Sequence, residues 1–518
     1  MKRTFILAIL DGWGLGNFDA SNPIYMAHPE AMNFIHTHFP SCALQASGIA
    51  AGLPWEEEGN SEVGHITIGA GKIIYQHLPR ISLSVEDGSF FENENLKKAF
   101  AHAKKNDSAV HLVGLLTAGN VHASMKHLAA LIDMAKKEHC EKLYLQLISD
   151  GRDSPPHSLL ELIERLREEL TRNNRGVISS ISGRYYAMNR DEHWDRTERA
   201  YRVLVGLDTT QRATTIAETT TKTYADQSTD EFIEPWIIGD PHPISDNDAV
   251  IFFNFREDSM RQIVEPFVSP SFSKFKKKQL KNIQIVTMTS YRNDFAIPVA
   301  FPNETVEYPL GRVLAEQGKT QLRIAETQKY AHVTYFFNGL REEPFPNEFR
   351  VLIPSLNVPH PEEKPDMMAS AITDRVLAAL SENAFDVIVI NYANADIIAH
   401  TGNYDASLKA VAAIDREIKR LLEKTLAENH ILLVTSDHGN AEVLIDLKTG
   451  QAETKHNPNP VPFYVVAKEF ELANPHPERY RPESIGLLAD VAPTLLALMN
   501  LPKPPEMTGQ NLVDQMFR

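Results

Sequence analysis

Short apolar runs alternate with amphipathic stretches along most of the chain. The runs predict buried strands at 4–10, 110–116, 143–148, 177–181, 249–253, 283–288, 385–391 and 430–436. Between them, apolar residues recur at helical spacing in stretches such as 158–170 and 405–428. Helices that alternate with buried strands are typical of an α/β protein with largely parallel sheets.

The residues that follow the strands differ between the ends and the middle of the chain. Near the ends the strands lead to aspartate and histidine, whereas in the middle they lead to arginine. We therefore expect one domain formed by residues 1–76 and 309–518, interrupted by an inserted domain at 77–308. Both crossing regions contain proline and lack clear periodicity. A chain of 518 residues is also longer than one hydrophobic core usually supports.

The aspartate and histidine residues near the two ends form a candidate metal site. They are Asp11, Asp396, His400, Asp437, His438 and His456. In an open α/β sheet, ligands bind beyond the carboxyl ends of the strands, where most of these residues fall. A lone aspartate after a strand is more often a helix cap, but a set of nitrogen and oxygen ligands suits Mn²⁺ or Zn²⁺. The set is larger than one ion needs, which favours a two-metal site for phosphate chemistry.

Ser61 is the candidate nucleophile beside these ligands. It lies in Gly59-Asn-Ser-Glu-Val-Gly-His65, where the glycines would let the backbone turn tightly on both sides. A serine hydroxyl reacts at neutral pH only when a base or a metal removes its proton. By itself the stretch fits an ordinary helix N-cap equally well. Next to a two-metal site, Ser61 becomes the natural phosphate acceptor.

Arginines follow the strands of the middle segment. Three of these strands are followed by four arginines, Arg152, Arg184, Arg190 and Arg256, which could therefore converge at one sheet edge. Guanidinium groups bind carboxylate and phosphate through paired hydrogen bonds. One such arginine is more often a surface ion-pair partner, but four favour a site for a small acid that carries a phosphate. Asp153 fits two interpretations equally, a general acid/base for a substrate hydroxyl or a turn residue.

Composition excludes several classes of function. The net charge of −16 argues against a nucleic-acid binder, which needs a cationic surface. Only Cys42 and Cys140 are present, so no disulfide framework or cysteine metal site is indicated. No run approaches membrane-spanning length, and the apolar stretch before Asp11 is too short for a signal peptide. We expect a cytoplasmic monomer that acts on a small molecule and binds neither nucleic acid nor membrane.

Several uncommon stretches occur in an order that resembles the cofactor-independent phosphoglycerate mutases of the alkaline phosphatase superfamily. They include Ile9-Leu-Asp-Gly-Trp-Gly14, Gly59-Asn-Ser-Glu-Val-Gly-His65, Asp150-Gly-Arg-Asp-Ser-Pro-Pro156, Gly183-Arg-Tyr-Tyr-Ala-Met188, Ala325-Glu-Thr-Gln-Lys-Tyr-Ala-His332, Asn391-Tyr-Ala-Asn-Ala-Asp396 and Thr435-Ser-Asp-His-Gly-Asn440. The resemblance covers essentially the whole chain. It implies an alkaline-phosphatase-like, metal-binding domain built from both chain ends, with an inserted α/β domain that binds substrate.

The resemblance also implies an activity and a role for individual residues. The activity is an isomerase of glycolysis and gluconeogenesis that interconverts 3-phosphoglycerate and 2-phosphoglycerate through a phosphoserine, without bisphosphoglycerate. Two manganese ions are implied, with other divalent metals possible. By position in the family's pattern, one ion is held by Asp396, His400 and His456, and the other by Asp11, Ser61, Asp437 and His438. Substrate contacts fall to His122, Arg152, Asp153, Arg184, Arg190, Arg256 and Lys329, of which Asp153 and Lys329 join Ser61 in catalysis.

Departures from the family's pattern concern the substrate contacts. Asn189 replaces a usual aspartate, and Ser259 stands where a second substrate arginine is expected after Arg256. Arg261, two residues further on, is a candidate replacement for that arginine. A phosphatase or phosphopentomutase with the same metal residues is the alternative enzyme, and a non-catalytic scaffold is the alternative from another class.

Overall fold

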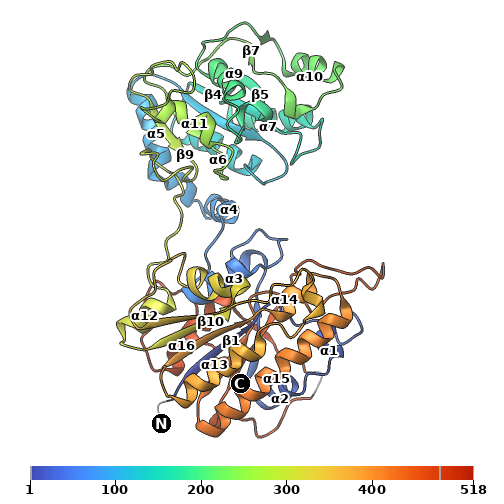
Figure 1. The fold of residues 1–518 in the computed structure, drawn as a ribbon. Coiled ribbons are helices and arrows are strands. Elements are labelled where there is room, and N and C mark those ends of the chain that lie inside the picture. Colours follow the sequence, from blue (N-terminus) through green and yellow to red (C-terminus); the bar gives the residue numbers. More distant parts are fainter. Residues whose placement is uncertain (1–2, 478–479, 517–518) are drawn as a thin grey trace. The chain divides into compact units, whose positions relative to one another are not determined.

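The computed structural model describes residues 3–477 and 480–516 of the chain. The chain divides into two compact units, each described by itself below (Figure 1). The first unit consists of Met1–Gln76 and Glu304–Arg518, and the second of His77–Asn303. The return crossing therefore lies at Glu304, a little before the position that the sequence suggested.

The first unit contains a sheet of eight described strands in the order β11-β10-β12-β1-β13-β14-β2-β15. Their bounds are β1 Phe5–Leu10, β2 Ser41–Gln45, β10 Gln321–Glu326, β11 Glu348–Ile353, β12 Val387–Tyr392, β13 Ile431–Thr435, β14 Val461–Val466 and β15 Ser484–Leu487. Strand β1 pairs in parallel with β12 on one side and with β13 on the other. Strand β14 runs antiparallel to both of its neighbours, β13 and β2.

Helices cover both faces of this sheet (Figure 1). Helices α2 (Glu30–His38), α13 (Ala369–Ser381) and α15 (Tyr404–Glu428) pack on one face, and α3 (Ser61–Ala70), α12 (Leu310–Glu316) and α16 (Val491–Leu498) on the other. Alternate residues of β1 belong to the two opposite cores, so every position of the strand is buried. Burial on both faces explains why the strand reads as an unbroken apolar run. The shorter helices of this unit are α1 Pro23–Met26, α14 Asn394–Ala399 and α17 Val513–Met516.

The second unit contains a seven-stranded sheet in the order β6-β7-β5-β4-β3-β8-β9. Its strands are β3 Val110–Leu116, β4 Leu143–Ser149, β5 Val177–Gly183, β6 Arg212–Ala213, β7 Trp236–Ile238, β8 Ala249–Phe252 and β9 Gln284–Thr287. Its helices are α4 His77–Asp87, α5 Glu94–Lys105, α6 Met125–Lys137, α7 Leu159–Asn173, α8 Arg184–Ala187, α9 Trp194–Leu204, α10 Ile216–Ala225 and α11 Arg261–Val268. One hydrophobic core joins these elements.

The predicted α/β class is confirmed, and each strand expected from an apolar run is present. The sequence reasoning missed β10 and β11, which carry charged residues, and several short or antiparallel strands such as β14. Strands β10 and β11 lack an unbroken apolar run, and β14 lies outside the group of parallel strands. In the described part of the chain, no helix has the length and apolar character needed to cross a membrane.

Candidate functional site

The predicted metal ligands of the first unit come together at one edge of its sheet. Asp11 directly follows β1, Asp396 lies in α14 after β12, and Asp437 follows β13 after one residue. Since β12, β1 and β13 are adjacent parallel strands, their carboxyl ends open at the same edge. His400 follows α14 directly, so its ring reaches back to Asp396 one turn earlier, with Nε2 and Oδ1 3.2 Å apart.

Three groups of side chains have ligand atoms close enough to hold a metal ion. They are Asp396 with His400 and His456, Asp11 with Asp396 and His438, and Asp11 with His65 and Asp437. Two carboxylates, Asp11 and Asp396, each belong to two groups. The groups therefore form one continuous cluster rather than separate sites. His65 is the member of the cluster that the sequence did not predict, although it ends the Gly59–His65 stretch that contains Ser61.

Ser61 is the first residue of α3, and its hydroxyl faces this cluster. The side chain of Asn60 caps the helix by accepting a hydrogen bond from the Val63 amide, so the stretch does form a helix N-cap. Ser61 Oγ lies 2.9 Å from His438 Nε2 and 3.2 Å from Asp11 Oδ1. A helix N-terminus also favours a negatively charged group at this position.

Lys329 lies at the centre of the cluster. It ends the 3₁₀ turn η4 (Thr327–Lys329), which directly follows β10, and its side chain is almost fully buried. Its ammonium group donates to Asp11 Oδ1, Ser61 Oγ and Asp396 Oδ2, each at 2.7 Å. One cation thus contacts the candidate nucleophile and two carboxylates at once.

Gly59 and Gly64 serve close packing rather than the tight turns that the sequence suggested. Neither residue has φ in the left-handed region. A Cβ atom at Gly64 would stand 2.6 Å from Asp437 O, and one at Gly59 would stand 2.3 Å from Ala46 O. The missing side chains let the start of α3 approach the loop that carries Asp437.

The buried charges of the cluster shift one another's protonation. Burial disfavours the ammonium form of Lys329, but Asp11 and Asp396 outweigh it and raise its pKa above the usual value. Burial likewise disfavours the charged ring of His438, yet Asp437 and the other carboxylates raise its pKa to about 9. Burial would raise the pKa of Asp437, but the neighbouring His438 and His65 lower it well below its ordinary range.

The donor set fits divalent metal ions. Asp11 and Asp437 are fully buried, and buried carboxylates need cations to offset their lost hydration. Asp437 Oδ2 accepts no hydrogen bond from any residue that the structure describes. Imidazole nitrogens and carboxylate oxygens at these separations are the ligands of Mn²⁺, Zn²⁺ and Co²⁺ sites. The surroundings support the ligands as well, since Asn391 donates to Asp11 and Asn440 to Asp396.

The second unit has a cavity of about 380 Å³ with a strongly cationic lining. The residues around it include His122, Arg152, Asp153, Arg184, Arg190, Arg196, Glu231, Arg256 and Ser259. Four of the arginines are those that the sequence placed after the middle strands. The structure brings them together because β3, β4, β5 and β8 are parallel and their carboxyl ends lie at one edge.

Arg184, which is buried, pairs with Asp153 in the lining of this cavity. Arg184 Nη1 donates to Asp150 Oδ1 and Asp153 Oδ2, each at 2.6 Å. His122 Nε2 lies 3.8 Å from the same Asp153 oxygen. Burial and the Arg184 charge lower the pKa of His122, which keeps its ring neutral near pH 7. Asp150 was not selected from the sequence, although it stands in the same stretch as Arg152 and Asp153.

Asp258 joins the remaining predicted residues. It accepts a hydrogen bond from Arg190 at 2.6 Å and lies 3.4 Å from Arg256 Nε. The sequence gave no signal for it beyond its place between Arg256 and Ser259. Ser259 Oγ lies 3.1 Å from His122 Nδ1. Arg261 does not line this cavity, because its Nε donates to the carbonyl of Tyr291 at 2.9 Å.

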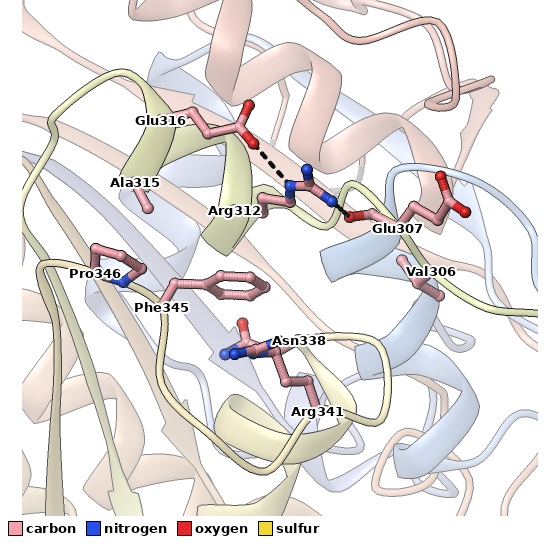
Figure 2. Close-up of a pocket in the computed structure, with 9 residues that line it drawn as sticks. All are labelled: Val306, Glu307, Arg312, Ala315, Glu316, Asn338, Arg341, Phe345 and Pro346. Atoms are coloured by element: carbon pink, nitrogen blue, oxygen red, sulfur yellow. Dashed lines mark hydrogen bonds and ion pairs between the residues drawn. The ribbon is translucent and has the colours of Figure 1, made fainter.

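The first unit also has a cavity of about 550 Å³, and none of the metal-ligand candidates lines it (Figure 2). Arg312 on its wall donates to the Glu316 carboxylate at 2.7 Å and to the Glu307 carbonyl at 2.9 Å. Within the described part of the chain, neither histidine nor serine lines it. This lining therefore offers neither a serine nucleophile nor a histidine ligand.

Known proteins resemble this chain over nearly its whole length. Residues 81–293 match a family model described as “BPG-independent PGAM N-terminus”. The 2,3-bisphosphoglycerate-independent phosphoglycerate mutase of Clostridium novyi is 46% identical over 519 residues, covering 99% of both chains. A protein of the same name from Methanosarcina acetivorans is 44% identical, with 99% of each chain covered. A crystal structure of Leishmania mexicana phosphoglycerate mutase at low cobalt concentration is 28% identical, with a TM-score of 0.53, and covers 99% of this chain and 98% of its own.

Proposed function

The chain belongs to the family of 2,3-bisphosphoglycerate-independent phosphoglycerate mutases, and we propose that it moves the phosphoryl group through a phosphoserine on Ser61. It is an isomerase that interconverts 3-phosphoglycerate and 2-phosphoglycerate, a step of glycolysis. The observation that carries the proposed mechanism is the threefold contact of Lys329 with Ser61, Asp11 and Asp396. It joins a nucleophile to two carboxylates suited to metal ions.

The first unit would carry the nucleophile and the metal ions. Asp396, His400 and His456 would hold one divalent ion, and Asp11, Ser61, Asp437 and His438 a second, for which we propose manganese. When bound, such ions lower the pKa of a coordinated hydroxyl and neutralise charge on phosphoryl oxygens. Lys329 stabilises the Ser61 alkoxide by its hydrogen bond and adds positive charge beside the phosphoryl group.

The second unit would hold the glycerate portion of the substrate. Arg152, Arg184, Arg190, Arg256 and His122 would bind its anionic groups, because they line one cavity. Paired hydrogen bonds from guanidinium groups would fix the orientation of the acid as well as offset its charge.

Asp153 would move the protons. As the phosphoryl group passes from O3 of glycerate to Ser61 Oγ, Asp153 gives its proton to O3. The carboxylate of Asp153 then takes the proton of the 2-hydroxyl, whose oxygen attacks the phosphoserine and releases Ser61. Arg184 contacts Asp153 Oδ2 at 2.6 Å and so holds the carboxylate in place through both steps.

The alternative of a phosphatase or phosphopentomutase is not favoured, because the curated relatives matched over nearly the whole chain are named as phosphoglycerate mutases. A hydrolase also has no need for an acid/base that serves two hydroxyls of one acid. We further propose a monomer, since one chain carries both sets of residues. Since glycolysis is a cytoplasmic pathway, we propose the same location for this enzyme.

The decisive experiment measures conversion of 3-phosphoglycerate to 2-phosphoglycerate with Mn²⁺ and without bisphosphoglycerate. The wild-type chain should convert it, and phosphoserine should be recovered at residue 61 after rapid acid quenching. Ser61→Ala should lose both signals, and Ser84→Ala, a serine of helix α4, serves as the matched control. Release of inorganic phosphate alone would establish a phosphatase instead. Sedimentation of the same sample tests the monomer.

A further inference from the structure

Arg196 lines the cationic cavity of the second unit but was not among the residues selected from the sequence. It lies in the first turn of α9 and is partly exposed. Its guanidinium group stacks on the ring of Tyr185, with Cζ 4.0 Å from the ring centroid. Tyr185, which follows Arg184, lines the same cavity. Stacking on an aromatic ring holds the guanidinium plane while its N–H groups stay available around the edge.

The other arginines of the cavity all have carboxylate partners. Arg184 pairs with Asp150 and Asp153, Arg190 and Arg256 pair with Asp258, and Arg152 pairs with Glu231. Among the residues that the structure describes, no carboxylate pairs with Arg196, and its guanidinium group donates no hydrogen bond. Its positive charge is therefore the one in this lining that the protein does not itself offset. An anion in the cavity would find these donors free.

The residue at position 259 gives a reason why the substrate site would need a further cation. A second substrate arginine is expected there, but the residue is Ser259, which is buried and contacts His122 Nδ1 at 3.1 Å. Arg261 does not fill the gap, since it bonds to the Tyr291 carbonyl and lines a different cavity. The lining thus lacks one expected arginine and contains an unexpected one without a carboxylate partner.

We propose that Arg196 binds the carboxylate of phosphoglycerate and supplies the cationic contact that Ser259 cannot make. This role rests on the proposed function of the cavity as the site that holds the glycerate portion. The guanidinium group would donate two parallel hydrogen bonds to the carboxylate, in the orientation that Tyr185 already imposes. Since 3-phosphoglycerate and 2-phosphoglycerate share this carboxylate, Arg196 would contribute equally to the binding of both.

The test compares Arg196→Ala with Arg199→Ala in the full-length enzyme with Mn²⁺. Arg199 is a matched control on the same helix, since it stacks on the adjacent Tyr186 but pairs with Glu234 and does not line the cavity. Arg196→Ala should raise KM about 10- to 100-fold in both reaction directions, with kcat changed by less than about 3-fold. Arg196→Lys should raise KM by a smaller factor, because an ammonium group keeps the charge but loses the paired geometry. Arg199→Ala should match the wild type.

The outcomes separate this inference from the function on which it rests. An inactive wild-type chain would refute the mutase mechanism and, with it, the proposed role of Arg196. An active wild type with unchanged KM in Arg196→Ala would overturn the role of Arg196 alone. An equal rise in KM for Arg199→Ala would also overturn it, since the effect would then belong to the general charge of α9. Equal thermal unfolding midpoints of the wild type, Arg196→Ala and Arg199→Ala would show that the KM change of Arg196→Ala does not come from misfolding.

Discussion

The two charged clusters of this protein are built in opposite ways. In the first unit, carboxylates gather where water is excluded, and Asp11 and Asp437 have no exposed surface. In the second unit, arginines gather around an open cavity, and the side chains of Arg152 and Arg190 are 60% and 53% exposed. A buried charge must be offset in every state of the folded protein, whereas an exposed one is screened by water. The first cluster should therefore need bound cations to keep its structure. The second cluster should keep its structure without a ligand and should affect only the affinity for substrate.

The sharpest way to test this contrast is to remove one carboxylate from the first cluster. Asp396 belongs to two of the ligand groups and contacts Lys329, so Asp396→Asn should reduce both metal content and activity. We expect activity to fall on the order of 10⁴-fold, because the residue supports the nucleophile and the metal ligands together. Metal analysis of the purified protein and the mutase assay measure the two effects. The exposed Asp405→Asn on α15 is the control. Retention of the full metal content by Asp396→Asn would contradict the assignment.

Removing the metal ions should affect the two units unequally. A ligand present at 100 times its Kd stabilises the folded state by about 2.7 kcal/mol, and only the first unit carries the proposed ligands. Chelation should therefore speed amide hydrogen exchange in peptides from the first unit and leave peptides within 77–303 nearly unchanged. Mass spectrometry of the intact chain, with and without Mn²⁺, measures this. In Asp396→Asn, Mn²⁺ should slow amide exchange in the first unit much less than it does in the wild type. Equal protection of both units by Mn²⁺ would contradict the expected difference between the clusters.

A substitution in the second cluster should lower the affinity for substrate and leave the metal content of the protein unchanged. Arg184 is buried and reaches both Asp150 and Asp153, which the single ammonium group of lysine cannot do in the same geometry. We expect Arg184→Lys to lower kcat/KM about 10- to 100-fold with the metal content of the wild type. Arg165→Lys, at an exposed ion pair on α7, is the control. Loss of metal from Arg184→Lys would show that the two clusters are not independent.

The smallest expected effect concerns the pH dependence of stability in the second unit. His127 is fully buried, and burial lowers its pKa to about 3. The unfolded state, with a histidine pKa near 6.5, binds the proton first, so the residue costs stability as the pH falls below about 6.5. From pH 6.5 to 5 this loss amounts to about 1.5 kcal/mol. His127→Gln should therefore flatten the pH dependence of hydrogen exchange in α6, whereas exposed His157→Gln should not. A slope identical to that of the wild type in His127→Gln would refute the effect.

Local sequence patterns could identify the individual residues of both clusters. Apolar runs predict parallel strands, and in parallel sheets the residues after neighbouring strands lie at one edge. Asp11, Asp396 and Asp437 could therefore be grouped from their positions alone, and so could Arg152 and Arg184. The resemblance to a known family added Lys329, which follows a strand that carries polar residues and escaped the pattern.

What local patterns could not supply is the set of partners around each residue. Nothing in the spacing of the chain places Asp258 against Arg190 or leaves Arg196 without a carboxylate. These contacts depend on how helices such as α9 pack against the sheet, and packing brings together residues that are remote in sequence. The sequence therefore specified which chemical groups the protein carries and at which edge of each sheet they lie. Only the tertiary structure decided which of the described charges offset one another and which has no carboxylate partner. The physical reason is that electrostatic interactions depend on distance and burial rather than on order along the chain.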